Sequence, residues 1–395
     1  MRVLHVIPSL GASRGGPSFV MKTLARGLAE SGVDVHIATT DDDGKGRLDV
    51  KHGVPIEDGG VTYWFFPRQT RFYSVSWPLS RWLAMNVAGY DVVHIHALFS
   101  FPSVAAAYWA RRKKAPYVVR PLGTLNRWSI QNRRPLMKKL SLRLLEVRIL
   151  RAAAAVHFTS EQERLEAQDC CPTDNAVVIP NPLDREDPAI DVTRGRLRSQ
   201  YPALAERVWI LFLSRIDPKK GLDLLLPAFA RLRALHPGTA LIVAGDGDPG
   251  YVKSLRGLAA KLGVEADIVW TGFITGEEKR AALTDCDVFA LPSYSENFGV
   301  AALDAMASGL PLVVSDQVAI HKEIAEAGAG LVVPCSEDAV LEALVATVRD
   351  APLRFRLGRN ARLAAQQFSV EKVVVRLLDL YAQTAARGRP EDVPH

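Results

Sequence analysis

The sequence has few cysteines and no long apolar run. Only four of its 395 residues are Cys, and their positions, which include the adjacent pair Cys170 and Cys171, give no CxxC spacing for zinc binding or redox chemistry. No stretch approaches the length of a membrane-spanning helix. The start, MRVLHVIPSLG, is apolar only briefly and lacks a small-residue cleavage site, which predicts a first buried strand and not a signal peptide. We therefore expect a cytoplasmic protein with reduced thiols.

Composition and length indicate a soluble protein of two domains. Apolar residues make up 48% and charged residues 23% of a chain that is too long for one core of ordinary size. The charge is uneven, with 25 Lys and Arg against 16 Asp and Glu up to residue 185, and 24 against 27 beyond it. The first half is therefore basic, but it has no nucleic-acid-binding motif, so we expect no nucleic-acid partner.

Short β-branched runs alternate with helical patterns along the whole chain. This alternation predicts an α/β fold with two Rossmann-like domains, whose parallel sheets face each other across a cleft. We expect the first domain at 1–185, the second at 186–370, and a C-terminal helix at 371–395 that crosses back towards the first domain. The predicted strands are RVLHVI, VDVHIATT, DVVHIH, APYVVR and AAVHFT in the first half, and VWILFLS, TALIVAG, ADIVWTG, DVFALPS, PLVVS and GLVVP in the second.

A glycine-rich loop, LGASRGGPS, follows the first strand. Gly15 and Gly16 stand just before a helix that starts near Pro17, so the backbone there can approach a ligand and point free N–H groups at an anion. A tight turn with no ligand is the alternative. The loop is not a dinucleotide fingerprint, because G-x-G-x-x-G is absent.

The segment LSRIDPKKG in the second half carries cations at a strand-to-helix junction. Arg215 follows a buried strand, Lys220 lies five residues on, and Gly221 opens a helix, so two cations and a helix N-terminus can converge on a diphosphate. A charged, solvated loop is the alternative. Further on, Gly245 and Gly247 suit a close backbone approach to a ligand, and the loop containing Phe273 can seat a flat ring.

Two carboxylates mark the stretch SENFGVAALDAMASG. Glu296 lies where a strand hands over to a helix, which is where α/β proteins bind ligands, although a carboxylate there is also a good helix cap. Asp304 lies eight residues on among small apolar residues, and a carboxylate buried in such a helix needs a hydrogen-bond partner. Ribose hydroxyls would serve as that partner.

Taken together, these motifs resemble the retaining glycosyltransferases of the GT-B fold, the large group 1 family marked by two glutamates separated by seven residues. The resemblance rests on the GGP loop, R-x-x-x-x-K-G, AGDG, TGF, and D-x-F-x-L-P-S followed by SENFGVAALDAMASGLPLV. It implies a nucleotide-diphosphate sugar donor, bound mostly by the second domain. It places Arg215 and Lys220 on the diphosphate, Glu296 near the sugar hydroxyls, and the second acid on the ribose. The segment Asn297, Phe298 and Gly299 would add backbone amides to the phosphate and sugar site.

The sequence departs from the family pattern at two positions. The second acid is Asp304 where the family usually has glutamate, and Leu122 stands where relatives often have a histidine that approaches the donor sugar. The second change suggests a less polar sugar, such as a 6-deoxy sugar. Arg120, Gly123 and Asn126 are our candidates for the acceptor side.

The resemblance implies that the chemistry needs no metal and no cofactor. In a front-face transfer the leaving diphosphate takes the acceptor proton, so the protein contributes mainly electrostatic stabilisation. His94 and His96 alternate on a strand end, but with no third ligand visible and His5 expected in the core, we predict structural roles. The triplet Asp285-Cys286-Asp287 resembles a metal-binding D-x-D, but it precedes a buried strand.

A basic amphipathic helix is predicted over residues 126–151. This stretch has eight Lys or Arg and one acid, with Leu136, Leu140, Leu144 and Val147 at helical spacing. Such a helix can lie on the inner surface of an anionic membrane, or pack its apolar side on the core.

These features predict a retaining hexosyl- or deoxyhexosyltransferase. Its acceptor would be a hydroxyl on a glycan that is lipid-linked or a precursor of a polysaccharide or lipopolysaccharide. The alternatives are a nucleotide-sugar epimerase of the same fold and a non-catalytic sugar- or nucleotide-binding protein of two domains.

Overall fold

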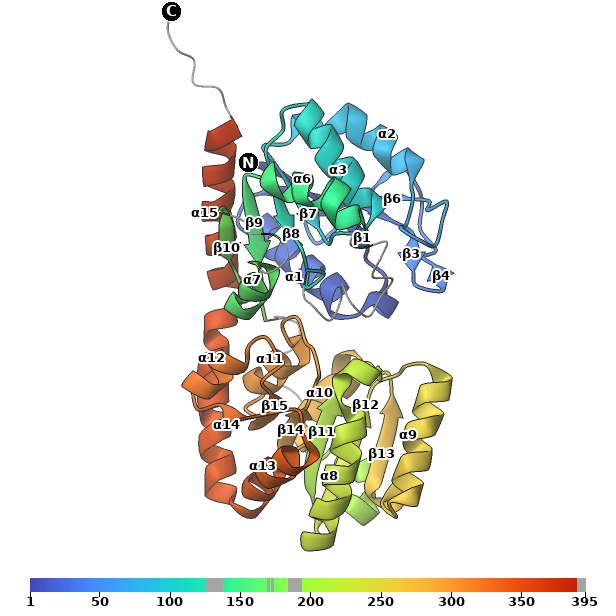
Figure 1. Cartoon of the computed structure of the whole chain (residues 1–395), viewed down its shortest axis with the longest axis vertical. Coiled ribbons are helices and arrows are strands. Elements are labelled where there is room, and N and C mark those ends of the chain that lie inside the picture. The colour runs from blue at the N-terminus through green and yellow to red at the C-terminus, as the bar shows by residue number, and fades with distance from the viewer. Residues whose placement is uncertain (126–137, 139, 169–170, 172–173, 184–193, 389–395) are drawn as a thin grey trace, which may run out of the picture. The chain divides into compact units, whose positions relative to one another are not determined.

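The computed structural model describes residues 1–125, 138, 140–168, 171, 174–183 and 194–388. The chain forms two compact units (Figure 1). Unit 1 consists of Met1–Pro182 and Val370–His395, and unit 2 of Leu183–Ser369. The chain passes from one unit to the other at 182/183 and 369/370, where the sequence predicts 185/186 and 370/371.

Unit 1 is built on an eight-stranded sheet with the order β10-β9-β8-β7-β1-β2-β6-β5. All neighbouring strands are parallel except β5, which runs antiparallel to β6 at the edge. The expectation of a wholly parallel sheet was therefore wrong at this edge. Five strands were predicted: β1 Arg2–Ser9, β2 Asp34–Thr40, β7 Val92–His96, β8 Tyr117–Arg120 and β9 Ala155–Phe158. The others are β5 Pro55–Asp58, β6 Val61–Phe66, β10 Ala176–Val178, and a small separate hairpin of β3 Asp42–Asp43 and β4 Gly46–Arg47.

Helices of unit 1 begin at residues suited to that position. Ser76 and Ser100 each cap a helix by accepting a backbone N–H of its first turn, and a proline follows close behind. The segment 142–146 is a π-helical turn, and residues 126–137 and 139 of the predicted basic helix lie outside the described residues. The helices are α1 Gly16–Glu30, α2 Trp77–Asn86, α3 Phe101–Arg112, the π-helix η3 Leu142–Glu146, α6 Val147–Arg151, α7 Glu161–Gln168 and α15 Val370–Gly388.

Unit 2 has a six-stranded, fully parallel sheet with the order β13-β12-β11-β14-β15-β16. This is the doubly wound order. Successive strands are added on one side of β11 up to β13 and then, from β14, on its other side, so the switch point lies between β11 and β14. Ligands of such sheets bind at the carboxyl ends of the strands beside that switch point. The strands are β11 Val208–Leu213, β12 Thr239–Ala244, β13 Ile268–Gly272, β14 Val288–Leu291, β15 Leu312–Ser315 and β16 Gly330–Val333. The helices are α8 Leu222–Leu235, α9 Pro249–Lys261, α10 Gly276–Asp285, α11 Val300–Ala307, α12 His321–Glu326, α13 Glu337–Arg349 and α14 Ala351–Ala365.

The last two helices of the chain, α14 and α15, belong to different units. α14 packs in unit 2 against α11, and the chain then turns at Ser369. α15 packs in unit 1 against α1, where Gly27 leaves room for the side chains of Val370 and Val374. The amphipathic pattern of α15 is explained by this packing on unit 1.

Candidate active site

The loops that follow β11 and β14 touch at the switch point of unit 2. Gly221 has φ 72° and lies so close to the carbonyl oxygen of Pro292 that any Cβ would overlap it. The backbone N–H of Tyr294 donates to the carbonyl of Lys219 at 2.8 Å. These contacts bring the cation-bearing loop and the Glu296 loop together at the expected ligand edge of the sheet.

Three cations surround the Glu296 carboxylate. Lys220, which is almost fully buried, donates a hydrogen bond to it as part of an ion pair. Burial alone would raise the pKa of Glu296, but Lys220, Lys219 and the exposed Arg215 together lower it below its usual value. The predicted residues Arg215, Lys220 and Glu296 are therefore electrostatically coupled, and the carboxyl is ionised at neutral pH.

Lys219 is a member of this cluster that the sequence analysis missed. Burial, followed by the charge of Lys220, lowers the pKa of its ammonium. The signal was present in the Lys219-Lys220 doublet, but a doublet at a loop does not say which of its side chains turns inward.

Asp304 has a partner within the chain. It lies on α11 with 6% of its side chain exposed, and its Oδ2 is 2.9 Å from the ammonium of Lys279 on α10. The partner that a buried carboxylate requires is therefore supplied in part by Lys279. Lys279 was not foreseen, because it lies on a different helix.

The glycines after β12 are explained by the neighbouring backbone. A Cβ at Gly245 would overlap the carbonyl of Ser214, and one at Gly247 would overlap that of Ile216, with which Gly247 forms a parallel bridge. These glycines let the loop after β12 lie against the loop that carries Arg215, so a ligand is not needed to account for them.

The aromatic residues of the predicted donor site differ in exposure. Phe273, after β13, is 56% exposed, whereas Phe298 is 2% exposed and packs edge-to-face on Phe368. Only the backbone of Phe298 is thus available to a ligand. Asn297 is half-buried, and Gly299, with φ 97°, precedes the first residue of α11.

The glycine-rich loop of unit 1 forms a short 3-10 turn before α1. Gly15 has φ 73°, and α1 begins at Gly16 with no side chain capping its first N–H groups. Arg14 donates to the buried Asp42, which also accepts from Arg68. This ion-pair network fixes the turn, and the uncapped helix start is suited to an anion.

Family models match both units. The model described as glycosyl transferases group 1 matches residues 194–364, and the glycosyl transferase 4-like domain matches residues 15–182. Together they cover every strand of both sheets except β1.

The chain belongs to the group 1 glycosyltransferases.

Named relatives agree with this assignment. The glycosyltransferase is 29% identical over 404 residues to the D-inositol 3-phosphate glycosyltransferase of Salinispora arenicola. The alignment covers 95% of this chain and 89% of the relative. It is 32% identical over 213 residues to the GDP-mannose-dependent alpha-(1-6)-phosphatidylinositol monomannoside mannosyltransferase of Mycobacterium tuberculosis, covering 51% and 54% of the two chains.

A solved structure shows the same fold. The crystal structure of Anabaena HepE in complex with UDP and glucose matches with a TM-score of 0.78 at 20% identity, over 97% of this chain and 99% of that one. The predicted fold class, α/β with two Rossmann-like domains of the GT-B type, is confirmed.

The structure of the glycosyltransferase changes our interpretation of the acceptor-side candidates. Arg120 is 1% exposed and donates a hydrogen bond to Asn181 inside unit 1. Its side chain is therefore buried and does not offer the surface contact for an acceptor that the sequence analysis suggested. The N–H of Gly123 is already donated to Glu163 at 2.6 Å. Asn126 lies outside the described residues.

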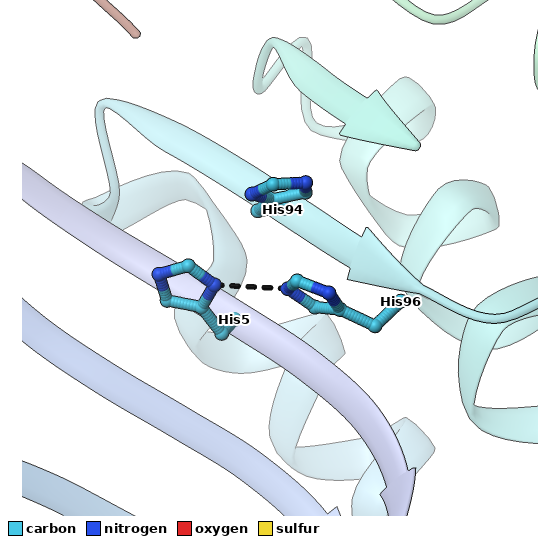
Figure 2. A group of neighbouring side chains, drawn as sticks. All are labelled: His5, His94 and His96. Carbon is cyan, nitrogen blue, oxygen red and sulfur yellow. Dashed lines mark hydrogen bonds between the residues drawn. The ribbon is translucent and has the colours of Figure 1, made fainter. Parts of the chain in front are cut away.

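A cluster of buried histidines lies beside Arg120 in this glycosyltransferase. Figure 2 shows His5 of β1 next to His94 and His96 of β7, with His5 Nδ1 2.9 Å from His96 Nε2. Their possible ligand atoms all lie within 4.8 Å of one another. Our expectation that no third ligand lies near His94 and His96 was wrong, because parallel pairing of β1 with β7 places His5 directly opposite His94.

The surroundings of the cluster favour neutral imidazoles over a bound metal. Neutral histidines are good ligands, and burial followed by Arg120 lowers the pKa of His5 to about 3. However, the buried guanidinium of Arg120, whose charge lowers the pKa of all three imidazoles, would repel a divalent cation at the same place. His94 Nδ1 instead forms a hydrogen bond with the hydroxyl of Tyr381 at 2.7 Å, which ties α15 to the sheet.

The D-x-D triplet forms structural contacts in this glycosyltransferase. Asp285 is fully buried, and its carboxylate accepts the backbone N–H groups of Leu197 at 2.6 Å and Arg198 at 3.0 Å. Asp287 forms an ion pair with Arg198. Both carboxylates anchor the start of unit 2 to its sheet.

Proposed function

We propose that this glycosyltransferase transfers a hexosyl or deoxyhexosyl group from a nucleotide-diphosphate sugar to a hydroxyl, with retention at the anomeric carbon. The observation that carries the proposal is the ionised Glu296, surrounded by Lys220, Lys219 and Arg215 at the switch point of unit 2. The cations match a diphosphate, and the carboxylate matches sugar hydroxyls. The relatives support the donor class, since one is named as GDP-mannose-dependent and a structure of similar fold holds UDP and glucose.

In this mechanism the protein acts mainly on the leaving group. Arg215 and Lys220 stabilise the negative charge that grows on the diphosphate as the bond to the sugar breaks. Glu296 accepts hydrogen bonds from the sugar hydroxyls and orients the anomeric carbon towards the acceptor. The acceptor oxygen attacks from the side of the departing diphosphate, which takes up the acceptor proton, so no step requires a side-chain nucleophile or a metal.

Asp304 serves the nucleotide ribose in this proposal. Its Oδ2 is engaged by Lys279, and a carboxylate has further lone pairs that can accept ribose hydroxyls. Lys279 would hold the carboxylate in place before the nucleotide arrives.

The direct test is a thermal-shift panel of UDP, GDP, ADP, dTDP and CMP, with and without magnesium. A ligand that binds only the folded state raises its stability, so one diphosphate should stabilise the protein without magnesium. Arg215→Ala and Lys220→Ala should each make the binding free energy of that nucleotide less favourable by about 1.5–3 kcal/mol, the range for charge-assisted hydrogen bonds. Lys261→Ala, at an exposed position on α9, is the matched control. Unchanged affinity in the first two variants, or no stabilisation by any nucleotide, would contradict the proposal.

We also propose that the acceptor is presented at a membrane surface. On α2, Trp77, Arg81 and Met85 follow one another at four-residue spacing, and Trp77 and Met85 are 66% and 69% exposed. Tyr108 on the neighbouring α3 is also exposed and is followed by a run of four basic residues, 111–114. Aromatic and basic groups together suit anionic lipid, and no helix within the described residues is long and apolar enough to cross a bilayer.

Vesicle sedimentation tests the membrane proposal. The protein should sediment with vesicles rich in phosphatidylglycerol and stay in solution with phosphatidylcholine vesicles. A Trp77→Ser, Met85→Ser double variant should sediment less, and Phe355→Ser, which removes an exposed aromatic of unit 2, should make no difference. Equal behaviour with both lipids would rule the proposal out.

A deoxy sugar donor remains our proposal for the sugar. Leu122 is half-buried at the carboxyl end of β8, where it offers a methyl-sized apolar contact. We expect GDP-fucose or dTDP-rhamnose to be turned over faster than GDP-mannose or UDP-glucose. A strong preference for a 6-hydroxylated donor would contradict this part.

A further inference from the structure

The loop that follows β8 holds a leucine in an unusual backbone conformation. Leu122 has φ 55°, in the left-handed region that branched aliphatic residues rarely adopt, and Gly123 follows with φ 70°. Such a conformation costs free energy and persists only where neighbouring contacts enforce it. The contacts that enforce it here can be identified.

Glu163 on α7 supplies the main contact across to this loop. Its Oε1 accepts the backbone N–H of Gly123 at 2.6 Å, and its Oε2 accepts both the N–H and the hydroxyl of Thr159 at 2.7 Å. The loop also closes on itself, since the hydroxyl of Thr124 donates to the carbonyl of Pro121 at 2.7 Å. One carboxylate therefore joins the ends of two neighbouring strands, β8 and β9.

Burying the Glu163 carboxylate costs folding free energy unless those hydrogen bonds are made. Its side chain is 4% exposed, and burial raises the pKa of the carboxyl, against the influence of Thr159, Gly123 and Arg120. A buried carboxylate with well-made hydrogen bonds is a rigid support, because each bond is charge-assisted and directional. An exposed residue could not hold the loop in this way.

The supported loop lies where a Rossmann-like sheet presents its ligand-binding residues. It leaves the carboxyl end of β8, and Leu122, at its bend, is the only residue of Pro121–Thr124 with a positive φ and a side chain. Fixing the backbone at Gly123 fixes the direction in which the Leu122 side chain points.

We propose that Glu163 is a positioning residue for sugar transfer, which holds the loop 121–124 so that Leu122 keeps its left-handed conformation at the ligand edge of unit 1. The inference rests on the proposed function, because it assigns the loop to the substrate site. Glu163 itself touches no substrate and acts only through the N–H of Gly123.

Three variants of the full chain test this. Glu163→Ala removes both acceptors, and Glu163→Gln keeps one oxygen that can still accept from Gly123. Glu161→Gln is the matched control, because Glu161 lies on the same helix with half of its side chain exposed and pairs with Arg164. Each variant is assayed for release of nucleoside diphosphate from GDP-fucose, dTDP-rhamnose, GDP-mannose and UDP-glucose. The affinities for UDP, GDP and dTDP and the backbone hydrogen exchange are measured as well.

We expect Glu163→Ala to slow diphosphate release by about tenfold to a hundredfold, the size of effect that a displaced substrate contact produces. Nucleotide affinity should stay within about twofold of the unaltered protein, because the predicted cations lie in unit 2. Exchange should become faster in the peptide covering 121–125 while that of β8 stays slow. The release rate and the loop exchange of Glu163→Gln should lie between those of Glu163→Ala and those of the unaltered protein. Both quantities in Glu161→Gln should match the unaltered protein.

Release at the unaltered rate in Glu163→Gln and Glu163→Ala, measured well below their unfolding temperatures, would overturn the proposal. So would faster exchange throughout unit 1, which would show that Glu163 supports only the fold. If the unaltered protein neither binds a nucleotide nor releases one, the proposed function fails and the positioning role fails with it. Loosening of the 121–125 peptide would then still show that Glu163 holds the loop for a structural reason alone.

Discussion

Acid should destabilise unit 1 through its buried histidines. His5, His94, His96 and His157 are all at most 1% exposed. Burial is the main reason that the pKa of each is lowered, to about 3 for His5, and the charge of Arg120 adds to it in every case. The cluster therefore stays neutral over a pH range in which histidines of the unfolded chain become protonated.

The direction and size of the effect follow from proton linkage. In the unfolded chain each histidine has a pKa near 6.5, so the unfolded state binds more protons than the native state once the pH falls below that value. The stability that the neutral histidines contribute is therefore complete above about pH 6.5 and is lost as the pH falls from there, for His5 until the pH reaches about 3. Between about pH 7.5 and about pH 5.5 each histidine lowers the free energy of unfolding by about 1.4 kcal/mol, which is about 5.5 kcal/mol for the four. That is comparable with the whole stability of many domains.

Urea unfolding of the full chain over this pH range measures the loss. Because two units can unfold separately, hydrogen exchange of the β1 and β7 amides should be followed as well, since these strands report on unit 1. His157→Gln should keep a hydrogen bond to the carbonyl of Ile179, which His157 Nε2 contacts at 2.7 Å. This variant should reduce the acid sensitivity by about a quarter, or about 1.4 kcal/mol.

The control is His236→Gln, which removes a half-buried histidine from unit 2. It should leave the pH dependence of the β1 and β7 amides unchanged. Equal stability of unit 1 at about pH 7.5 and about pH 5.5, or an unchanged slope in His157→Gln, would refute the argument that the cluster is neutral in the native protein.

Further predictions concern unit 2. Lys279→Met should leave the buried carboxylate of Asp304 without its ammonium, lowering the free energy of unfolding by about 1–3 kcal/mol and weakening nucleotide binding; an unchanged urea midpoint would show that this ion pair contributes nothing. Gly245→Ala should destabilise by about 1–3 kcal/mol or more, because the new Cβ overlaps the carbonyl of Ser214, and wild-type stability in urea would contradict the close approach of the two loops. Gly257→Ala is the opposite case: it lies inside α9 with no atom in the way, so it should stabilise by about 1 kcal/mol, and a lowered midpoint would contradict the open space around it.

The strands that the sequence predicted are those with a strong local pattern. β1, β7 and β11 are continuous β-branched or apolar runs bounded by loops, and such a pattern is a property of a few adjacent residues. β3, β4, β5, β6 and β10 were missed, although β6, with the sequence VTYWFF, has a local pattern as strong as theirs. β5 and β10 lie at the edges of the sheet and are short, so pairing with a neighbour, and not their own composition, makes them strands.

Local sequence also determined the motif residues of the candidate site, because Arg215, Lys220 and Glu296 lie at fixed distances from strand ends. The partners of those residues were decided elsewhere. Lys279 reaches Asp304 from another helix, and nothing in the spacing of either residue indicates that the two helices touch.

Tertiary structure alone decided what surrounds the charged and strained groups of unit 1. His5 meets His96 across about ninety positions because β1 pairs with β7, and strand order and register are not encoded in any one segment. In the same way, the pairing of β8 with β9 brings Glu163 to Gly123, and Arg120, at the end of β8, is buried against Asn181. The sequence by itself determined which elements form and which motif residues stand at their ends, since both depend on neighbours in the chain. Which side chains face each other, and hence their charge states, depends on how distant elements pack.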